Sequence, residues 1–180
     1  MLRVTIPATE LWDESKEEFI NIKEQTLQLE HSLVSLSKWE SKWHKPFLSK
    51  DIKTEEETID YIRCMTITQN VDTKVYDFIP NNIREEIKEY IDDKMTATWF
   101  NDDKSGKGSS EQITSELIYY WMITQNIPIK CEKWHLNRLL TLIKVCNVKS
   151  QPPKKMGKKA LMNRNAALNA ARRKQLNTRG

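Results

Sequence analysis

Residues 113–143 read ITSELIYYWMITQNIPIKCEKWHLNRLLTLI, and this stretch decides the fold class. Two runs rich in large apolar side chains flank residues 126–128, where Pro128 lacks the amide hydrogen that a continuous helix needs. We expect one helix that is capped by Ser110 and a second helix that begins near Cys131. Two helices joined by so short a break pack as a helical hairpin or as a helix–turn–helix.

Each of these two expected helices carries apolar residues at helical spacing, which indicates a buried stripe. The stripe on the first helix is predicted to consist of Ile113, Leu117, Tyr120, Trp121 and Thr124. The stripe on the second helix is predicted to consist of His135, Leu139, Leu142 and Cys146, widened by Leu136, Leu140 and Ile143.

The residues before this stretch predict further helices. Residues 31–44 have helical spacing. Thr54 and Glu57 have the spacing of a capping box, in which each side chain accepts a hydrogen bond from the other residue's amide, and this pattern begins a helix. Another helix is expected to begin at Asn81 or Asn82, since asparagine is a favourable cap.

The N-terminus shows the two-residue alternation of half-buried strands instead. Apolar and polar residues alternate over 2–6, 19–23 and 26–29, and the polar residues 13–18 suit a connecting turn. Residues 94–100 favour a further short strand. A sheet of two or three strands needs a helical layer on one face. The predicted fold is α+β and mostly helical, with a small N-terminal antiparallel β element packed against about five helices.

The charge distribution separates a body from a tail. The chain of 180 residues has a formal net charge of +4, yet residues 150–180 hold nine of its 29 basic residues and none of its 25 acidic ones. Residues 1–149 therefore carry a net charge of −5. We expect a single domain over 1–149, with its β element in about 1–30 and its helices in about 31–149. The tail is expected to be disordered and basic, and to become ordered on a partner.

The sequence carries little sign of catalysis or of a membrane segment. No run approaches the roughly 18 apolar residues of a membrane-spanning helix, and we expect no signal peptide in the first residues. The cysteines Cys64, Cys131 and Cys146 are interpreted as reduced thiols. Cys131 and His135 have the spacing of a metal-ligand pair, but the second close pair of a structural zinc site is missing. We therefore expect no enzyme activity, no metal and no cofactor.

Three features bear on nucleic-acid binding. Trp39 and Trp43 lie among lysines, as base-stacking residues do, although packing of one helix face on the sheet is favoured. The helix around residues 133–144 has basic side chains, but its apolar residues leave few faces for a DNA groove. The basic tail suits nucleic acid or an acidic protein surface equally. A solubilising tail without a partner is the third interpretation.

Four stretches of the chain carry a resemblance to a known class of protein: ITSELIYYWMI at 113–123, WHLNRLLTLI at 134–143, LSKWESKW at 36–43 and NAARRK at 169–174. Together they resemble small proteins encoded in the tail-gene region of tailed bacteriophages, in particular the tail assembly chaperone class. The resemblance covers most of the chain. It implies a protein that coats the tape-measure protein until tube subunits replace it, with no catalytic residues.

From this resemblance we predict a tail assembly factor that binds tape-measure or tail-tube proteins in the cytoplasm of the host cell. A structural component of the virion tail or neck, a DNA-binding protein that uses its tail, and a homo-oligomer stay open. The expected partner-binding residues in the helical region are Trp121, Trp134 and Arg138. Those in the tail are Lys154, Lys155, Lys158, Lys159, Arg164, Arg172, Arg173 and Lys174.

Overall fold

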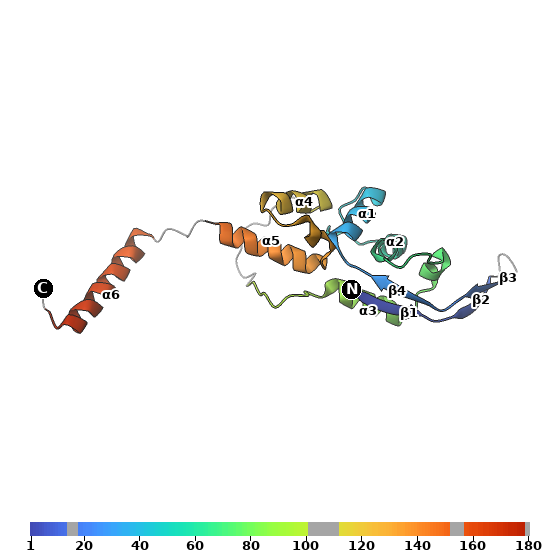
Figure 1. The fold of residues 1–180 in the computed structure, drawn as a ribbon, viewed down its shortest axis with the longest axis horizontal. Helices are drawn as coiled ribbons and strands as arrows, with labels where there is room; N and C mark the ends of the chain where they lie inside the picture. Colours follow the sequence, from blue (N-terminus) through green and yellow to red (C-terminus); the bar gives the residue numbers. More distant parts are fainter. Residues whose placement is uncertain (14–17, 101–111, 152–156, 179–180) are drawn as a thin grey trace. The chain divides into compact units, whose positions relative to one another are not determined.

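The computed structural model describes residues 1–13, 18–100, 112–151 and 157–178 (Figure 1). By its internal contacts the chain divides into two units, Met1–Asn147 and Val148–Gly180. The first unit combines a β-hairpin with helices, whereas a single helix dominates the second. The mostly helical α+β class predicted from the sequence is therefore confirmed.

Four short strands at the N-terminus form one long β-hairpin. They are β1 (Leu2–Ile6), β2 (Thr9–Asp13), β3 (Glu18–Ile22) and β4 (Gln25–Leu29). β1 pairs with β4 and β2 with β3, both antiparallel. The two ladders share one register, because Leu2 lies opposite Leu29 and Asp13 lies opposite Glu18. The alternation predicts β1, β3 and β4 but misses β2, whose two apolar residues are consecutive.

The helices follow in sequence order. They are α1 (Leu33–Trp43), α2 (Glu55–Met65), the 3₁₀ helix η1 (Thr73–Phe78), α3 (Asn81–Asp92), α4 (Ser115–Thr124), the 3₁₀ helix η2 (Ile129–Lys133), α5 (Leu136–Ser150) and α6 (Lys158–Leu176). The capping box at the start of α2 is confirmed, because the side chains and amides of Thr54 and Glu57 bond reciprocally. The predicted asparagine cap of α3 is wrong. Pro80 holds the cap position, where its fixed φ of −61° leads into the helix.

Two hydrophobic clusters form the core of the first unit, and α1 contributes to both. Trp39 lies in the cluster built from the hairpin, α2, η1 and α3, which we call the first cluster. Leu33 and Leu36 lie in the second cluster, built from α4, η2 and α5. None of these three side chains is more than 1% exposed. α1 is thus a wall shared by both clusters.

The buried face of α4 differs from the predicted stripe. Ser115, Ile118 and Met122 are buried, whereas Tyr120 and Ile123 are 59% and 71% exposed. The other members of the predicted stripe are half-buried or exposed: Leu117 and Trp121, then Ile113 and Thr124. The prediction is wrong because α4 is apolar around most of its circumference, so that spacing does not select one face. The predicted cap Ser110 lies outside the described residues and does not cap α4, because Thr114 holds the cap position and its hydroxyl accepts from the Leu117 amide over 3.4 Å.

The second predicted helix is divided into two pieces. Cys131 belongs to the short η2, and α5 begins only at Leu136. A β-bridge between Ser32 and His135, and a hydrogen bond from the Leu136 amide to the His31 carbonyl (2.9 Å), hold the backbone between the two pieces in an extended form. These long-range contacts override the helical spacing. The buried residues of α5 are Leu136, Leu139 and Ile143, whereas His135, Leu140, Leu142 and Cys146 are half-buried.

Residues 94–100 do not form the predicted strand. Met95 adopts a left-handed backbone conformation with φ of 48°, and its amide donates to the Asp93 side chain over 3.0 Å. Both features turn the chain and prevent regular extension. The segment is an irregular coil that follows α3.

The tail differs from the disordered segment that the sequence predicts. Lys158–Leu176 form α6, which ends at Asn177 in the left-handed conformation, with φ of 49°. The many alanines and straight-chain residues of this segment explain its helical form, because they lose little side-chain entropy in a helix. Wherever the structure describes side chains on α6, they are exposed.

Candidate functional site

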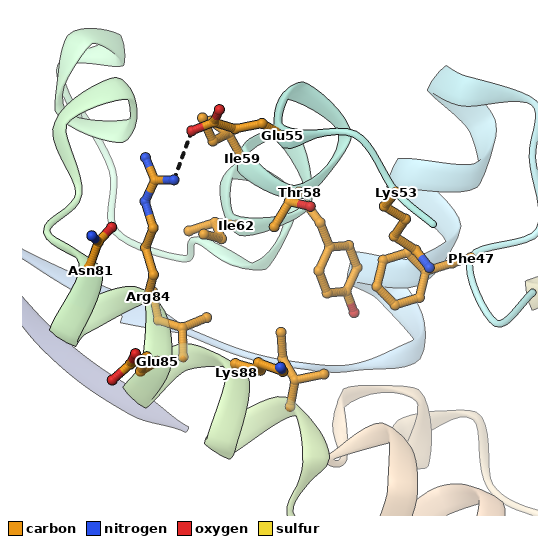
Figure 2. A pocket seen from close by; sticks show the side chains of 13 residues that line it. Phe47, Lys53, Glu55, Thr58, Ile59, Ile62, Asn81, Arg84, Glu85 and Lys88 are labelled. Atoms are coloured by element: carbon orange, nitrogen blue, oxygen red, sulfur yellow. Dashed lines mark hydrogen bonds and ion pairs between the residues drawn. The ribbon is translucent and has the colours of Figure 1, made fainter. Parts of the chain in front are cut away.

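A groove of about 490 Å³ lies between α2 and α3 (Figure 2). Its floor is apolar and includes Phe47, Ile59, Ile62 and Ile87. Ile62 and Ile87 belong to the first cluster, and the partly buried Phe47 and Ile59 pack against it. The groove therefore reaches the edge of the first cluster, where Phe47 and Ile59 are half-buried, and spacing along either helix alone gives no sign of it.

The rim of the groove carries charges of both signs. Arg84 of α3 donates to Glu55 of α2 over 2.8 Å, and Figure 2 shows this ion pair reaching from one helix to the other. Arg84 also donates from Nε to the Ile79 carbonyl over 3.0 Å, which fixes its guanidinium. Lys53 places its ammonium nitrogen 4.5 Å from the centroid of the Phe47 ring. An apolar floor with a charged rim suits an amphipathic segment of another protein.

Trp39 and Trp43 fix α1 against α2. The Trp39 indole nitrogen donates to the Glu57 carbonyl over 2.8 Å, and the Trp43 indole nitrogen donates to Asp60 over 2.9 Å. The two indole rings stack with centroids 6.1 Å apart. The tryptophan pair has a packing role, as predicted, but its indole nitrogens bond α2 and not the sheet.

Glu40 ties α1 to α4 through a buried carboxylate. One carboxylate oxygen accepts from the Phe47 amide over 2.8 Å, and the other accepts from the Ser115 amide over 2.7 Å. Ser115 is the first residue of α4, where the unpaired amides of the helix favour a negative charge. Glu40 is only 8% exposed. It thereby positions α4 and the face that α4 presents to solvent.

Four aromatic side chains gather where β4, α2, α3 and α5 approach one another. His31 Nδ1 lies 2.6 Å from the Tyr61 hydroxyl, and His135 Nε2 lies 2.9 Å from the Tyr90 carbonyl. The two imidazole rings are 4.9 Å apart between centroids. Burial, with a smaller effect of His135, lowers the pKa of His31 to about 3, and burial also lowers the pKa of His135. This cluster is therefore built from neutral imidazoles.

The structure brings together two of the three helical residues predicted to bind a partner. The Arg138 guanidinium lies 4.3 Å from the centroid of the Trp134 ring, a cation–π contact across the start of α5. Trp121 lies on α4, and both tryptophans pack against the second cluster. Arg138 is exposed and the two tryptophans are half-buried.

Sequence reasoning misses the exposed apolar face of α4. Tyr120 and Ile123 lie one helical turn apart on this face, and Ile113 precedes them at 38% exposure. The signal for this face is the apolar character of α4 on all sides, which exceeds what one core contact requires. The helix has one face for the second cluster and one that faces solvent.

Some of the predicted tail residues lie within the described ranges and two lie outside them. Lys154 and Lys155 lie outside the described residues. The other six lie on α6, and each is exposed: Lys158, Lys159, Arg164, Arg172, Arg173 and Lys174. α6 therefore presents basic side chains along its length.

The described ranges contain neither a metal-ligand cluster nor a helix suited to a membrane. No group of three or more His, Cys, Asp or Glu side chains in those ranges is placed to hold a metal ion. Cys131 lies in the second cluster, and His135 faces the Tyr90 carbonyl. The helices of the same ranges include none that is both long and apolar enough to cross a bilayer. Comparison of the chain with protein-family models, curated proteins and solved structures finds no match.

Proposed function

We propose that the chain is an assembly factor of a bacteriophage tail, which binds tape-measure or tail-tube proteins and acts in the host cytoplasm. The observation that carries this proposal is the exposure of α6, on which every described side chain faces solvent. Most helical stability in proteins comes from the packing of an apolar face, whereas the described side chains of α6 are exposed. α6 therefore gains stability by packing on a partner.

The side chains of α6 indicate the charge and the shape of the partner surface that would bind it. The helix contains basic residues and no acidic ones, so it is attracted to an acidic surface. Leu161, Met162 and Leu168 are 46%, 64% and 46% exposed, and each is available to enter an apolar pocket. The partner surface is thus acidic with apolar hollows, as on an amphipathic helical protein. The resemblance of the sequence to phage tail proteins supplies the class of that partner.

The exposed face of α4 supports a second contact on the same partner. Tyr120 and Ile123 give this face an aromatic and an aliphatic side chain in reach of one binding helix. Large exposed apolar side chains that gather on one face are typical of protein interaction sites. Glu40 holds α4 from beneath, so the face is presented on a fixed element.

Nucleic-acid binding through the tail is a second candidate, favoured by one observation. α6 and its flanking residues carry positive charges without an acidic residue among them, and such segments bind phosphates with release of counterions. A virion component is the third candidate, and it shares the protein contacts of the assembly factor. It differs in being retained in the finished particle.

The test is a pull-down of the full-length protein from infected host cells, treated with nuclease and analysed by mass spectrometry. We expect recovery of tape-measure or tail-tube protein. Recovery of neither, with binding lost on nuclease treatment, would overturn the proposal in favour of the second candidate. Mass spectrometry of purified phage particles distinguishes the assembly factor from a virion component, because an assembly factor is absent from the finished particle.

A matched pair of variants assigns the contact to α6. The triple variant Arg172→Gln, Arg173→Gln, Lys174→Gln removes three charges from α6. The control variant Lys50→Gln, Lys74→Gln, Lys130→Gln removes three exposed charges from the first unit. We expect the first variant to lose the tail protein and the control to retain it. Equal loss from both would show a general charge effect and contradict the role of α6.

A further inference from the structure

The coil that follows α3 places two adjacent aromatic side chains beside two lysines. Trp99 is 79% exposed, and the Lys94 ammonium nitrogen lies 4.5 Å from the centroid of its ring. Phe100 is half-buried, and the Lys144 ammonium nitrogen of α5 lies 4.6 Å from its ring centroid. The four side chains form a basic and aromatic cluster, which we call the Trp99 cluster.

The Trp99 cluster surrounds a cavity of about 280 Å³. Polar side chains share its lining with the cluster: Thr96, Thr98, Asn137 and Thr141. Asn137 of α5 donates from Nδ2 to the carbonyls of Ile91 (2.9 Å) and Asp93 (2.8 Å). These two bonds fix the end of α3, and with it the start of the coil, against α5. The cavity therefore lies between two helices that are fixed against each other, although one of its sides is formed by coil.

We propose that this cavity binds one nucleotide of a single-stranded nucleic acid, with the base stacked on Trp99 and the phosphates near Lys94 and Lys144. Aromatic faces interleaved with cations are the means by which proteins hold single strands, because every base has a face that stacks. An exposed tryptophan with a lysine over one face leaves its other face for a base. The threonine and asparagine side chains supply hydrogen bonds for base or sugar. This binding site lies outside α6 and goes beyond the proposed function.

The size of the cavity selects a single strand over a duplex. The volume of about 280 Å³ lies just below the roughly 300 Å³ at which small-molecule sites begin, and it accommodates one base with part of its sugar. In a duplex, each base is already stacked and paired, so reaching Trp99 would cost a few kcal/mol of unstacking. A flexible single strand offers a base at no such cost.

The acidic groups near the cluster set the strength and salt dependence of binding. Asp93 accepts from the Met95 amide, and Asp92 ends α3 beside it. The net charge of −5 on residues 1–149 also repels phosphates, but this effect is screened beyond about 10 Å at moderate salt. Lys94 and Lys144 act at shorter range. The binding is therefore weak and best measured at low salt.

The experiment measures fluorescence anisotropy of a labelled twelve-nucleotide thymidine strand with the full-length protein at low salt. Trp99→Leu should weaken binding on the order of tenfold, the loss of one stacked base. The matched control Trp12→Leu changes another exposed tryptophan, 51% exposed on β2, and should bind as the parent protein does. Lys94→Gln with Lys144→Gln should also weaken binding and should lower the salt slope by about one to two.

A full-length variant with Arg172→Gln, Arg173→Gln and Lys174→Gln separates the Trp99 cluster from α6. We expect this variant to keep its sensitivity to Trp99→Leu. Binding that depends on the α6 charges but not on Trp99 would overturn the proposal, as would the absence of any binding to the strand.

Three further ligands complete the test. A duplex of the same length should bind in a manner that Trp99→Leu does not change. Thymidine monophosphate that binds as tightly as the strand would show a site for free nucleotides and would overturn the single-strand assignment. Polyglutamate that binds in a Trp99-dependent manner with higher affinity than the strand would overturn it in favour of an acidic peptide.

Discussion

The Tyr61 hydroxyl lies 2.6 Å from Nδ1 of His31, in the interior of the first unit. Tyr61 is 2% exposed and His31 is equally buried, and burial raises the pKa of Tyr61 well above its usual value. The pair thus consists of a neutral phenol and a neutral imidazole at every pH near neutrality. It connects α2 with the junction of β4 and α1.

The first prediction concerns acid. The pKa of His31 is about 3 in the folded chain and near 6.5 when unfolded, so the unfolded chain binds the additional proton between these values. The stabilisation from neutral His31 is complete above pH 6.5 and is lost as the pH falls toward 3. We expect the free energy of unfolding to drop by about 2 kcal/mol between pH 7 and pH 5 from this residue.

Urea denaturation followed by circular dichroism at both pH values measures this drop. His135 acts in the same direction, because burial lowers its pKa as well. The exposed His44 provides the control, since His44→Asn retains a residue that tolerates the left-handed φ of 53° at the end of α1. A stability that does not change between pH 7 and pH 5 would contradict neutral burial of His31.

The second prediction concerns Tyr61→Phe. The substitution removes the hydroxyl and leaves His31 Nδ1 without that partner in a buried site, which costs about 1–3 kcal/mol. Equilibrium unfolding in urea measures the loss. Tyr120→Phe is the matched control, because Tyr120 is 59% exposed and its hydroxyl is accessible to water. Equal stability of the two variants would show that the buried bond is unimportant.

The third prediction concerns Glu40→Ala. The substitution removes the acceptor of both the Phe47 and the Ser115 amides, so we expect a loss of about 2–4 kcal/mol. Hydrogen exchange of the Ser115 amide should accelerate most. Glu56→Ala is the control, because Glu56 is exposed in the first turn of α2. Unchanged exchange at Ser115 would argue against Glu40 as the residue that positions α4.

The fourth prediction compares two neighbours on α4. Ile123→Lys should change stability by less than about 0.5 kcal/mol, because Ile123 is 71% exposed. Met122→Lys should unfold the first unit, because Met122 is fully buried in the second cluster and its lysine would lack a partner. Thermal unfolding distinguishes the two. A folded Ile123→Lys variant then allows the α4 contact to be tested in the pull-down.

The sequence predicts local features best where a few residues determine the outcome alone. The Thr54 and Glu57 capping box needs only a spacing of three residues, and the structure contains it. The alternation that predicts β1 and β4 likewise reports on one buried face, with Val4 and Leu27 paired across the ladder and buried. The α+β class follows from such local patterns.

The wrong predictions concern elements whose structure depends on contacts between residues that are far apart in the sequence. α4 is apolar on all sides, and only the approach of Glu40 and the second cluster selects Met122 over Tyr120 as the buried residue. Likewise, the bridge between Ser32 and His135 ends the helical path that the spacing around Cys131 predicts. The candidate sites depend on the same information. Trp99 and Lys144 are far apart in the sequence, and no pattern along the chain brings them together.

The position of α1 between the two clusters has a consequence for how the first unit unfolds. Trp39 and Glu40 are consecutive, yet one packs against α2 and the other holds α4. If either cluster loses its packing, α1 is displaced, and the other cluster loses its contacts with α1 as well. The first unit should melt in a single cooperative step, without a stage in which the hairpin half survives alone. A destabilising substitution near the groove would then affect the exposed face of α4 as well, because it lowers the folded population of the whole first unit.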